Sequence, residues 1–138
     1  MTGVTLISKN YIHKSILVNK AKEIAKELSF EIFTEKLYCE LDDLNFYIDI
    51  DDDLAYLITI WCMDEEQYKK DKIQLENETY FIAVDIEHDS EALPYLNKFL
   101  IKFLRAFPEM LVGDELHDAF YSISQIEGKD NLPKWLLV

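Results

Sequence analysis

Residues 54–63, LAYLITIWCM, form a run in which nearly every position is apolar. Side chains alternate between the two faces of a strand, so this run is apolar on both faces and predicts a strand in the interior of a sheet. Residues 44–50 alternate cleanly between apolar and polar side chains, which is typical of a strand with one buried face. Three aspartates, residues 51–53, separate the two runs. Residues 44–63 are therefore predicted to form a β-hairpin, although its turn lacks the glycine that tight hairpins favour.

Apolar periodicity predicts further strands and helices along the rest of the chain. Further strands are predicted at residues 4–7 (a short edge strand), 30–41 (with a turn or bulge near 34–36) and 79–87. Helices are predicted at residues 10–28, from an N-cap at Ser90 to a stop at Pro108, and at 114–127, because apolar residues recur there every three or four positions. Residues 64–78 are polar and are expected to form a long connection.

Strands grouped in one block, with helices before and after it, predict an α+β fold. We expect a mostly antiparallel sheet of about four to five strands, with one N-terminal and two C-terminal helices packed on it. The length of 138 residues fits a single α+β domain spanning 1–138. The apolar tail predicts that Trp135 and Leu137 are at least half buried, since an exposed apolar end promotes aggregation.

The charge excludes several classes of partner. The chain holds 27 acidic against 14 basic residues, a net charge of −13, which repels nucleic-acid phosphate and anionic lipid. No stretch approaches the roughly 20 apolar residues that span a bilayer, and the N-terminus lacks the pattern of a secretory signal. Cys39 and Cys62 are then expected to be buried thiols of a cytoplasmic protein.

Candidate chemistry is sparse. The run beginning at Asp49 resembles the start of a calcium loop, but it lacks the glycine and the glutamate at the required positions. Asp85 and Glu87 share one face of a predicted strand, where they could bind a cation or simply mark the end of the strand. The three histidines show no metal-binding spacing, and three glycines in total leave little for a phosphate loop. We expect no catalytic residue, no metal site and no cofactor.

The strongest functional signal is the acidic segment, residues 40–53, which holds seven carboxylates and neither lysine nor arginine. Aromatic residues lie within it and beside it, and tyrosine and tryptophan are common anchors of protein interfaces. Such carboxylates also speed the encounter with a basic surface. The predicted partner-binding residues are Asp42, Asp43, Tyr47, Asp49, Asp51, Asp52, Asp53 and Trp61. The alternative is a sheet whose acidic edge is merely solvated.

A short, acidic, aromatic-rich α+β chain without catalytic motifs resembles the bacterial immunity proteins that neutralise polymorphic toxins of the contact-dependent inhibition and Rhs types. The resemblance is one of type, covers the whole chain and assigns no role to any single residue. It implies direct binding to the catalytic domain of a cognate basic toxin, often a nuclease. The alternative from another class is a small acidic adaptor or regulatory subunit, monomeric or homodimeric, without catalytic activity. A third is a metal-binding or ligand-binding domain.

Overall fold

The computed structural model describes residues 2–33, 43–51, 54–129 and 131–137, and of residues 33, 43–51, 54 and 55 it describes the backbone alone. In chain order the elements are β1 (Thr2–Ser8), α1 (Lys14–Glu27), β2 (Glu31–Phe33), β3 (Asp43–Asp51), β4 (Leu54–Cys62), α2 (Glu65–Tyr68), β5 (Lys72–Leu75), β6 (Glu78–His88), the 3-10 helix η1 (Ser90–Ala92), α3 (Leu93–Ala106), β7 (Leu111–Asp114), β8 (Phe120–Tyr121), α4 (Ile123–Gly128) and the 3-10 helix η2 (Lys134–Leu136).

All strands of the described chain belong to one antiparallel sheet. Its order is β2-β3-β4-β6-β1-β7-β8, and β5 pairs with one end of β6. The predicted hairpin is confirmed as β3 and β4, with Ile48 opposite Tyr56 and Phe46 opposite Ile58. β4 lies in the interior of the sheet, between β3 and β6, as its apolar sequence predicts.

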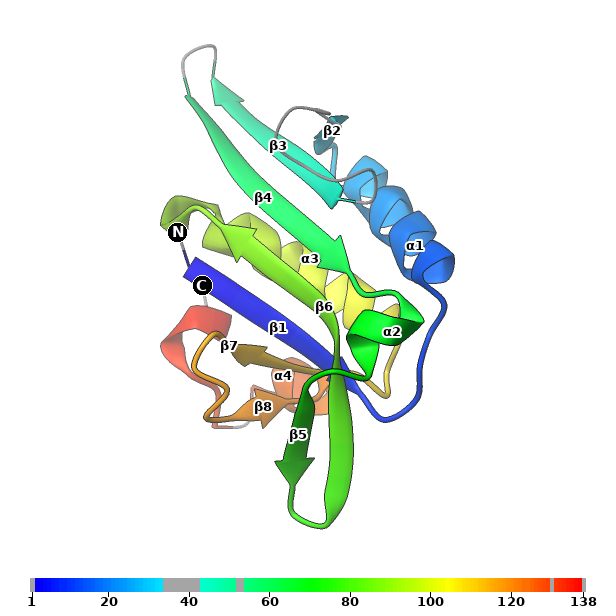
Figure 1. Cartoon of the computed structure of the whole chain (residues 1–138). Coiled ribbons are helices and arrows are strands. Elements are labelled where there is room, and N and C mark those ends of the chain that lie inside the picture. The colour runs from blue at the N-terminus through cyan, green and yellow to red at the C-terminus, as the bar shows by residue number, and fades with distance from the viewer. Residues whose placement is uncertain (1, 34–42, 52–53, 130, 138) are drawn as a thin grey trace.

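The two long helices, α1 and α3, pack against each other and lie behind the sheet in Figure 1. The predicted apolar stripe of α1 is buried, and so is most of that of α3. The rings of Phe99 and Phe103 stack with centroids 5.6 Å apart, and such aromatic pairs stabilise a core by roughly 0.5–1.5 kcal/mol beyond the area that they bury. α3 ends at Ala106, just before Pro108, as predicted.

Alternation along the central strands places apolar side chains on the helix side. Ile58, Ile60 and Cys62 of β4 are opposite His88, Ile86 and Val84 of β6, and all of these side chains are buried. The positions between them face away from α1 and α3 and hold polar residues and one tryptophan. These are Gly3 and Thr5 of β1, Thr59 and Trp61 of β4, and Asp85 and Glu87 of β6. We call this side of the sheet the open face; it is turned toward the viewer in Figure 1 and carries neither long helix.

Two strand predictions are wrong in detail. β1 is not an edge strand, because β6 pairs with one side of it and β7 with the other. The segment 64–78 is not a plain connection: Asp64 and Gln67 form a capping box that starts α2, and β5 follows as the partner of β6. Over the described residues the sheet therefore has eight strands, more than the four or five expected.

The predicted third helix is also wrong over most of its length. Residues 111–121 form β7, a turn and β8, and only Ile123–Gly128 is helical. Ser122 starts this helix through a capping box with Gln125, which leaves the residues before it free to pair with the sheet. Leu116 had the spacing of a helix core position, yet it is 70% exposed.

The α+β class with a mostly antiparallel sheet is confirmed, although α1 follows β1 in the chain and α3 precedes β7 and β8. Ser90 is not the N-cap of a long helix, since it opens η1 and its hydroxyl donates to the Glu91 carboxylate. In the tail, Trp135 packs against the core and is more than half buried, as predicted. Leu137 is 56% exposed, so the prediction for that residue is wrong.

Candidate functional site

Of the predicted partner-binding residues, Trp61 alone has a described side chain. Asp43, Tyr47, Asp49 and Asp51 lie in β3, where the backbone register is defined: Asp43 is opposite Trp61 and Tyr47 is opposite Leu57. Asp42, Asp52 and Asp53 lie outside the described residues. The structure thus places four of the acidic and aromatic candidates on a strand that pairs directly with the strand of Trp61.

Trp61 lies on the open face because its neighbours Ile60 and Cys62 face the helices. It is partly exposed and is opposite Asp85 of β6. The two residues line a hollow of about 350 Å³ together with Gly3, Thr5, Ile86, Glu87, Glu115 and His117. We call this the acidic hollow, since its lining includes three carboxylates and neither lysine nor arginine.

A chain of hydrogen bonds crosses the floor of the acidic hollow. The Thr5 hydroxyl donates to Asp85 Oδ1 over 3.1 Å, and Thr5 Oγ1 lies 3.1 Å from His117 Nε2. Since the hydroxyl proton goes to Asp85, the imidazole is the donor of the second bond. Thr5 is only 2% exposed, so burial fixes this link and with it the orientations of Asp85 and His117.

His117 reaches the hollow from the turn between β7 and β8. Its backbone adopts φ 57°, a left-handed conformation, and its ring lies 5.9 Å from that of Phe120. The turn is stabilised by Asp114 Oδ1, which accepts from the Leu116 backbone N–H over 3.1 Å. This turn therefore presents both Glu115 and His117 to the edge of the acidic hollow.

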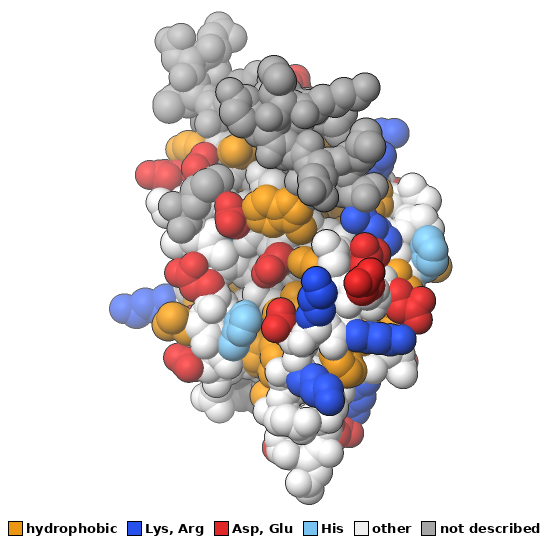
Figure 2. Space-filling model, in the orientation of Figure 1, with side chains coloured by type: hydrophobic (Ala, Val, Ile, Leu, Met, Phe, Trp, Pro, Cys, Tyr) orange, Lys and Arg blue, Asp and Glu red, His pale blue; other side chains and the backbone are white. Residues whose placement is uncertain are grey.

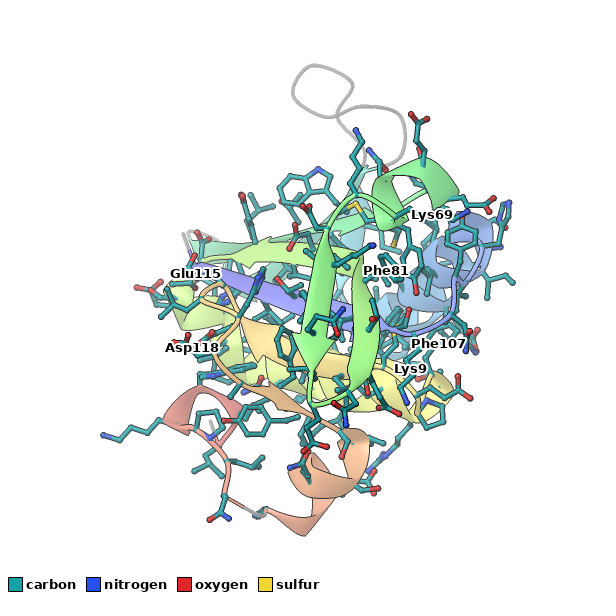
Figure 3. All side chains as sticks on the ribbon, turned by 60° about the horizontal axis from the view of Figure 1, so that its bottom comes forward. Lys9, Lys69, Phe81, Phe107, Glu115 and Asp118 are labelled. Atoms are coloured by element: carbon teal, nitrogen blue, oxygen red, sulfur yellow. The ribbon has the colours of Figure 1, made fainter. Side chains whose placement is uncertain are left out.

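The open face is polarised in charge. Figure 2 shows acidic side chains gathered over the left half of this face and most of the basic ones over the right half. In Figure 3 Glu115 and Asp118 lie on one side of the molecule, while Lys9 and Lys69 lie on the other. The lysines there are paired: Lys9 Nζ lies 2.7 Å from Glu78 and Lys69 Nζ lies 3.2 Å from Glu65.

A second hollow, of about 270 Å³, adjoins the first. We call it the apolar hollow, because Val4, Leu93, Leu116 and Trp135 contribute to its lining. Gly3 and Glu115 line both hollows, so the two are neighbours across the start of β1.

The remaining polar groups nearby have structural roles. His88, at the base of the apolar hollow, is 3% exposed; its Nδ1 lies 2.8 Å from the Asp89 carbonyl oxygen and its Nε2 lies 3.0 Å from Thr2 Oγ1. Asp89 Oδ2 accepts from the Leu57 backbone N–H over 3.0 Å. This bond holds the residue that precedes η1 against β4. Burial raises the pKa of Cys62 from 9.0 to about 12, so its thiol is protonated at neutral pH.

From the sequence, Asp85 and Glu87 were considered either as a pair that could share a cation or as acids that mark the end of a strand. Both do face the same hollow, but Asp85 accepts from Thr5, and the third carboxylate comes from the turn after β7. Within the described residues no group of three or more His, Cys, Asp or Glu side chains is arranged to hold a metal ion. Glu115 and His117 were missed because they were expected on a helix; the glycine at 113 was the available signal for a turn or close packing instead.

Comparisons with protein-family models, with curated protein sequences and with solved structures give no match. Among the described residues, no helix combines the length and the apolar character needed to cross a membrane.

Proposed function

We propose that this chain is a non-catalytic, cytoplasmic binding protein that neutralises a cognate basic toxin domain of bacterial origin by direct protein–protein contact. The observation that carries the proposal is the open face, where Trp61 borders a hollow lined by Asp85, Glu87 and Glu115. A partly exposed tryptophan supplies apolar contact area, and the carboxylates around it favour a positively charged partner.

The acidic segment identified in the sequence adds to this surface. Asp43 of β3 is opposite Trp61 of β4, so one end of the segment lies beside the acidic hollow along the backbone ladder. The seven carboxylates within residues 40–53 add negative charge to the segment that includes Asp43. Fields of this kind raise association rates by roughly ten- to a thousandfold at low salt.

The test uses the toxin-like domain encoded next to this chain's gene, produced as a catalytically inactive variant. The triple substitution D51N/D52N/D53N is expected to slow its association with this chain at least about threefold at low ionic strength. Near 0.15 M salt, where the Debye length falls to about 8 Å, the difference shrinks, and dissociation changes little. Stopped-flow or surface-plasmon kinetics at several salt concentrations measure both rates.

A matched control neutralises acids elsewhere, at Glu65 and Glu66 of the short helix α2, and is expected to leave the association rate nearly unchanged. Association that is equally fast for the triple variant and the native chain, at every salt concentration, contradicts the proposed role of the acidic segment. A neighbouring gene that encodes no toxin-like domain contradicts the neutralising function itself.

The second candidate is an adaptor or regulatory subunit that forms a homodimer. Leu116 and Leu137, which are 70% and 56% exposed, favour it because they are large apolar side chains open to solvent. Sedimentation equilibrium separates the candidates: a dimer that the L116S/L137S variant dissociates supports the adaptor, and a monomer at every concentration supports the binding protein.

A further inference from the structure

The acidic hollow has the features of a site for one cationic side chain. Its volume of about 350 Å³ is near the lower end of the roughly 300–1,000 Å³ range of ligand pockets, so it accommodates a small group rather than a large ligand. Among the described residues three carboxylates, one indole ring and the His117 imidazole line it, and no lysine or arginine does. A cation that enters gains charge attraction and contact with an aromatic face together.

Its carboxylates are available to an incoming donor. Within the described ranges, neither Glu87 nor Glu115 has a lysine or arginine partner, in contrast to Glu78 and Glu65 at the other end of the open face. Asp85 is held in place by the Thr5 hydroxyl, which bonds only one of its oxygens. One fixed carboxylate and two exposed ones offer several acceptors around one cavity.

The chemical groups in the lining favour a guanidinium group over an ammonium group or a metal ion. A guanidinium is planar and stacks on an indole, and its five N–H donors reach more than one carboxylate at once. An ammonium is a compact, strongly hydrated charge that uses such a flat surface less well. A metal ion needs ligands that converge on one point, which the described side chains do not do.

The apolar hollow extends the site. It shares Gly3 and Glu115 with the acidic hollow, and Leu116, exposed to 70%, follows Glu115 directly. A side chain at Gly3 would narrow this junction, because its Cβ would lie 3.4 Å from the Glu115 Cβ. Gly3 and Glu115 therefore lie close together where the two hollows meet, so groups bound in the two hollows are neighbours.

We propose that the acidic hollow binds an arginine side chain of the basic partner between Trp61 and the carboxylates of Asp85, Glu87 and Glu115, and that the apolar hollow binds a neighbouring apolar side chain of the same segment. This inference rests on the proposed function, since it names the chemistry by which that partner is recognised. The recognised segment is therefore an arginine flanked by an apolar residue.

The test uses a defined peptide, acetyl-Gly-Leu-Arg-Leu-Gly-amide, titrated into the ¹⁵N-labelled full chain and followed by NMR. The expected result is that the Trp61 indole N–H and the backbone amides of Thr5, Glu115 and His117 shift together along one binding curve. A peptide with citrulline in place of arginine, which keeps the shape without the charge, is expected to bind at least tenfold more weakly. A lysine peptide is expected to bind several-fold more weakly, and replacing the peptide's leucines by glycine is expected to remove the shifts at Leu116 and Trp135.

Variants of the chain locate the site. E87Q/E115Q is expected to weaken binding of the arginine peptide at least tenfold, whereas E109Q is expected to leave it unchanged, because Glu109 precedes β7 and Glu115 follows it. W61L is expected to weaken binding several-fold, and its melting temperature is measured beside that of the native chain. If W61L is unfolded, the two glutamate substitutions on the surface still decide the matter.

Equal binding of the arginine and citrulline peptides, or shifts confined to the lysine-rich end of the open face, overturns the inference. No detectable binding of any peptide at millimolar concentration overturns it as well. These results leave the proposed function standing if the toxin-like domain still binds. Conversely, peptide binding at the acidic hollow without any association with the toxin-like domain overturns the proposed function and leaves the arginine site intact.

Discussion

Removing one hydroxyl, in the variant Y68F, tests how α2 is fastened to the sheet. Tyr68 is 3% exposed, and its hydroxyl donates to the Ser8 backbone carbonyl over 2.8 Å. The Ser8 hydroxyl lies 3.1 Å from the same phenol oxygen and also donates to the Asn10 carbonyl over 2.9 Å. The ring itself packs on those of Tyr11 and Phe81, with centroids 5.4 and 5.1 Å away, and these contacts remain in the variant.

The expected loss follows from the groups that remain. In Y68F the buried Ser8 carbonyl oxygen loses its donor, which costs roughly 1–3 kcal/mol. The bond from the Ser8 hydroxyl to the Asn10 carbonyl remains. We therefore expect Y68F to lower the free energy of unfolding by about 1–2 kcal/mol. For a chain of this length that corresponds to a melting temperature lower by roughly 3–8 °C.

The assay is urea unfolding followed by tryptophan fluorescence, with Y11F as the matched control. The Tyr11 hydroxyl accepts only a long bond, 3.4 Å from the Lys14 backbone nitrogen, so Y11F is expected to cost less than about 0.5 kcal/mol. A double-mutant cycle with S8A measures the coupling between the two hydroxyl groups. If Y68F lowers the free energy of unfolding no more than Y11F does, the hydrogen bond of the Tyr68 hydroxyl does not stabilise the packing of α2 on β1.

The pH dependence of the free energy of unfolding under alkaline conditions tests the burial of Tyr68 independently. Burial raises the pKa of Tyr68 above its ordinary value of 10.0, and the hydrogen bond with Ser8 opposes this only in part. The folded state then keeps its proton when the unfolded state has lost it, so this contribution to stability is complete below about pH 10 and declines as the pH rises through the folded pKa. The stability difference between the native chain and Y68F is therefore expected to shrink above pH 10.

Two further predictions concern single positions. In a C39S background, the Cys62 thiol, whose pKa burial raises from 9.0 to about 12, is expected to react with a disulfide reagent at pH 8 at least about a hundredfold more slowly in the folded chain than in urea. Native labelling within tenfold of the unfolded rate would contradict its burial. G113A is expected to destabilise the chain by about 1–3 kcal/mol, because an added Cβ would lie 2.7 Å from the Phe120 ring and 2.8 Å from the Ala119 carbonyl oxygen. G128A, at the end of α4 with no atom within 4 Å of its Cβ position, is the control and is expected to be neutral or stabilising in the same thermal melts.

Elements with strong periodicity could be predicted from the sequence. The stripes of α1 and α3 are local patterns in which the buried face decides the structure, and the alternation of β3 is a local pattern of the sequence as well. The interior place of β4 followed from its two apolar faces for the same reason. Residues 111–121 could not be assigned this way, because the spacing of Leu116 and Phe120 fits a helix, while pairing with β1 and β8 decides the outcome.

The candidate site could be predicted only in part. Trp61 was identified because the sequence shows an aromatic residue on the predicted strand that follows the acidic segment. Thr5, Asp85 and Glu115 come together because β1 pairs with β6 and β7, a choice of partners that no local pattern encodes. The acidic hollow is thus a product of long-range strand order rather than of any motif.

The position of β1 has a consequence for how the chain is made. Of the described strands β1 leaves the ribosome first, and it pairs with residues 81–88 on one side and with residues 111–114 on the other. At a synthesis rate of about 5–20 residues per second, β1 waits roughly 5–20 s for its second partner. Both edges of β1 are unpaired until residues 81–88 emerge, and one edge stays unpaired until residues 111–114 follow. Folding governed by such distant pairings is slow. The nascent N-terminal segment is therefore the part of this chain for which we expect a chaperone to matter most.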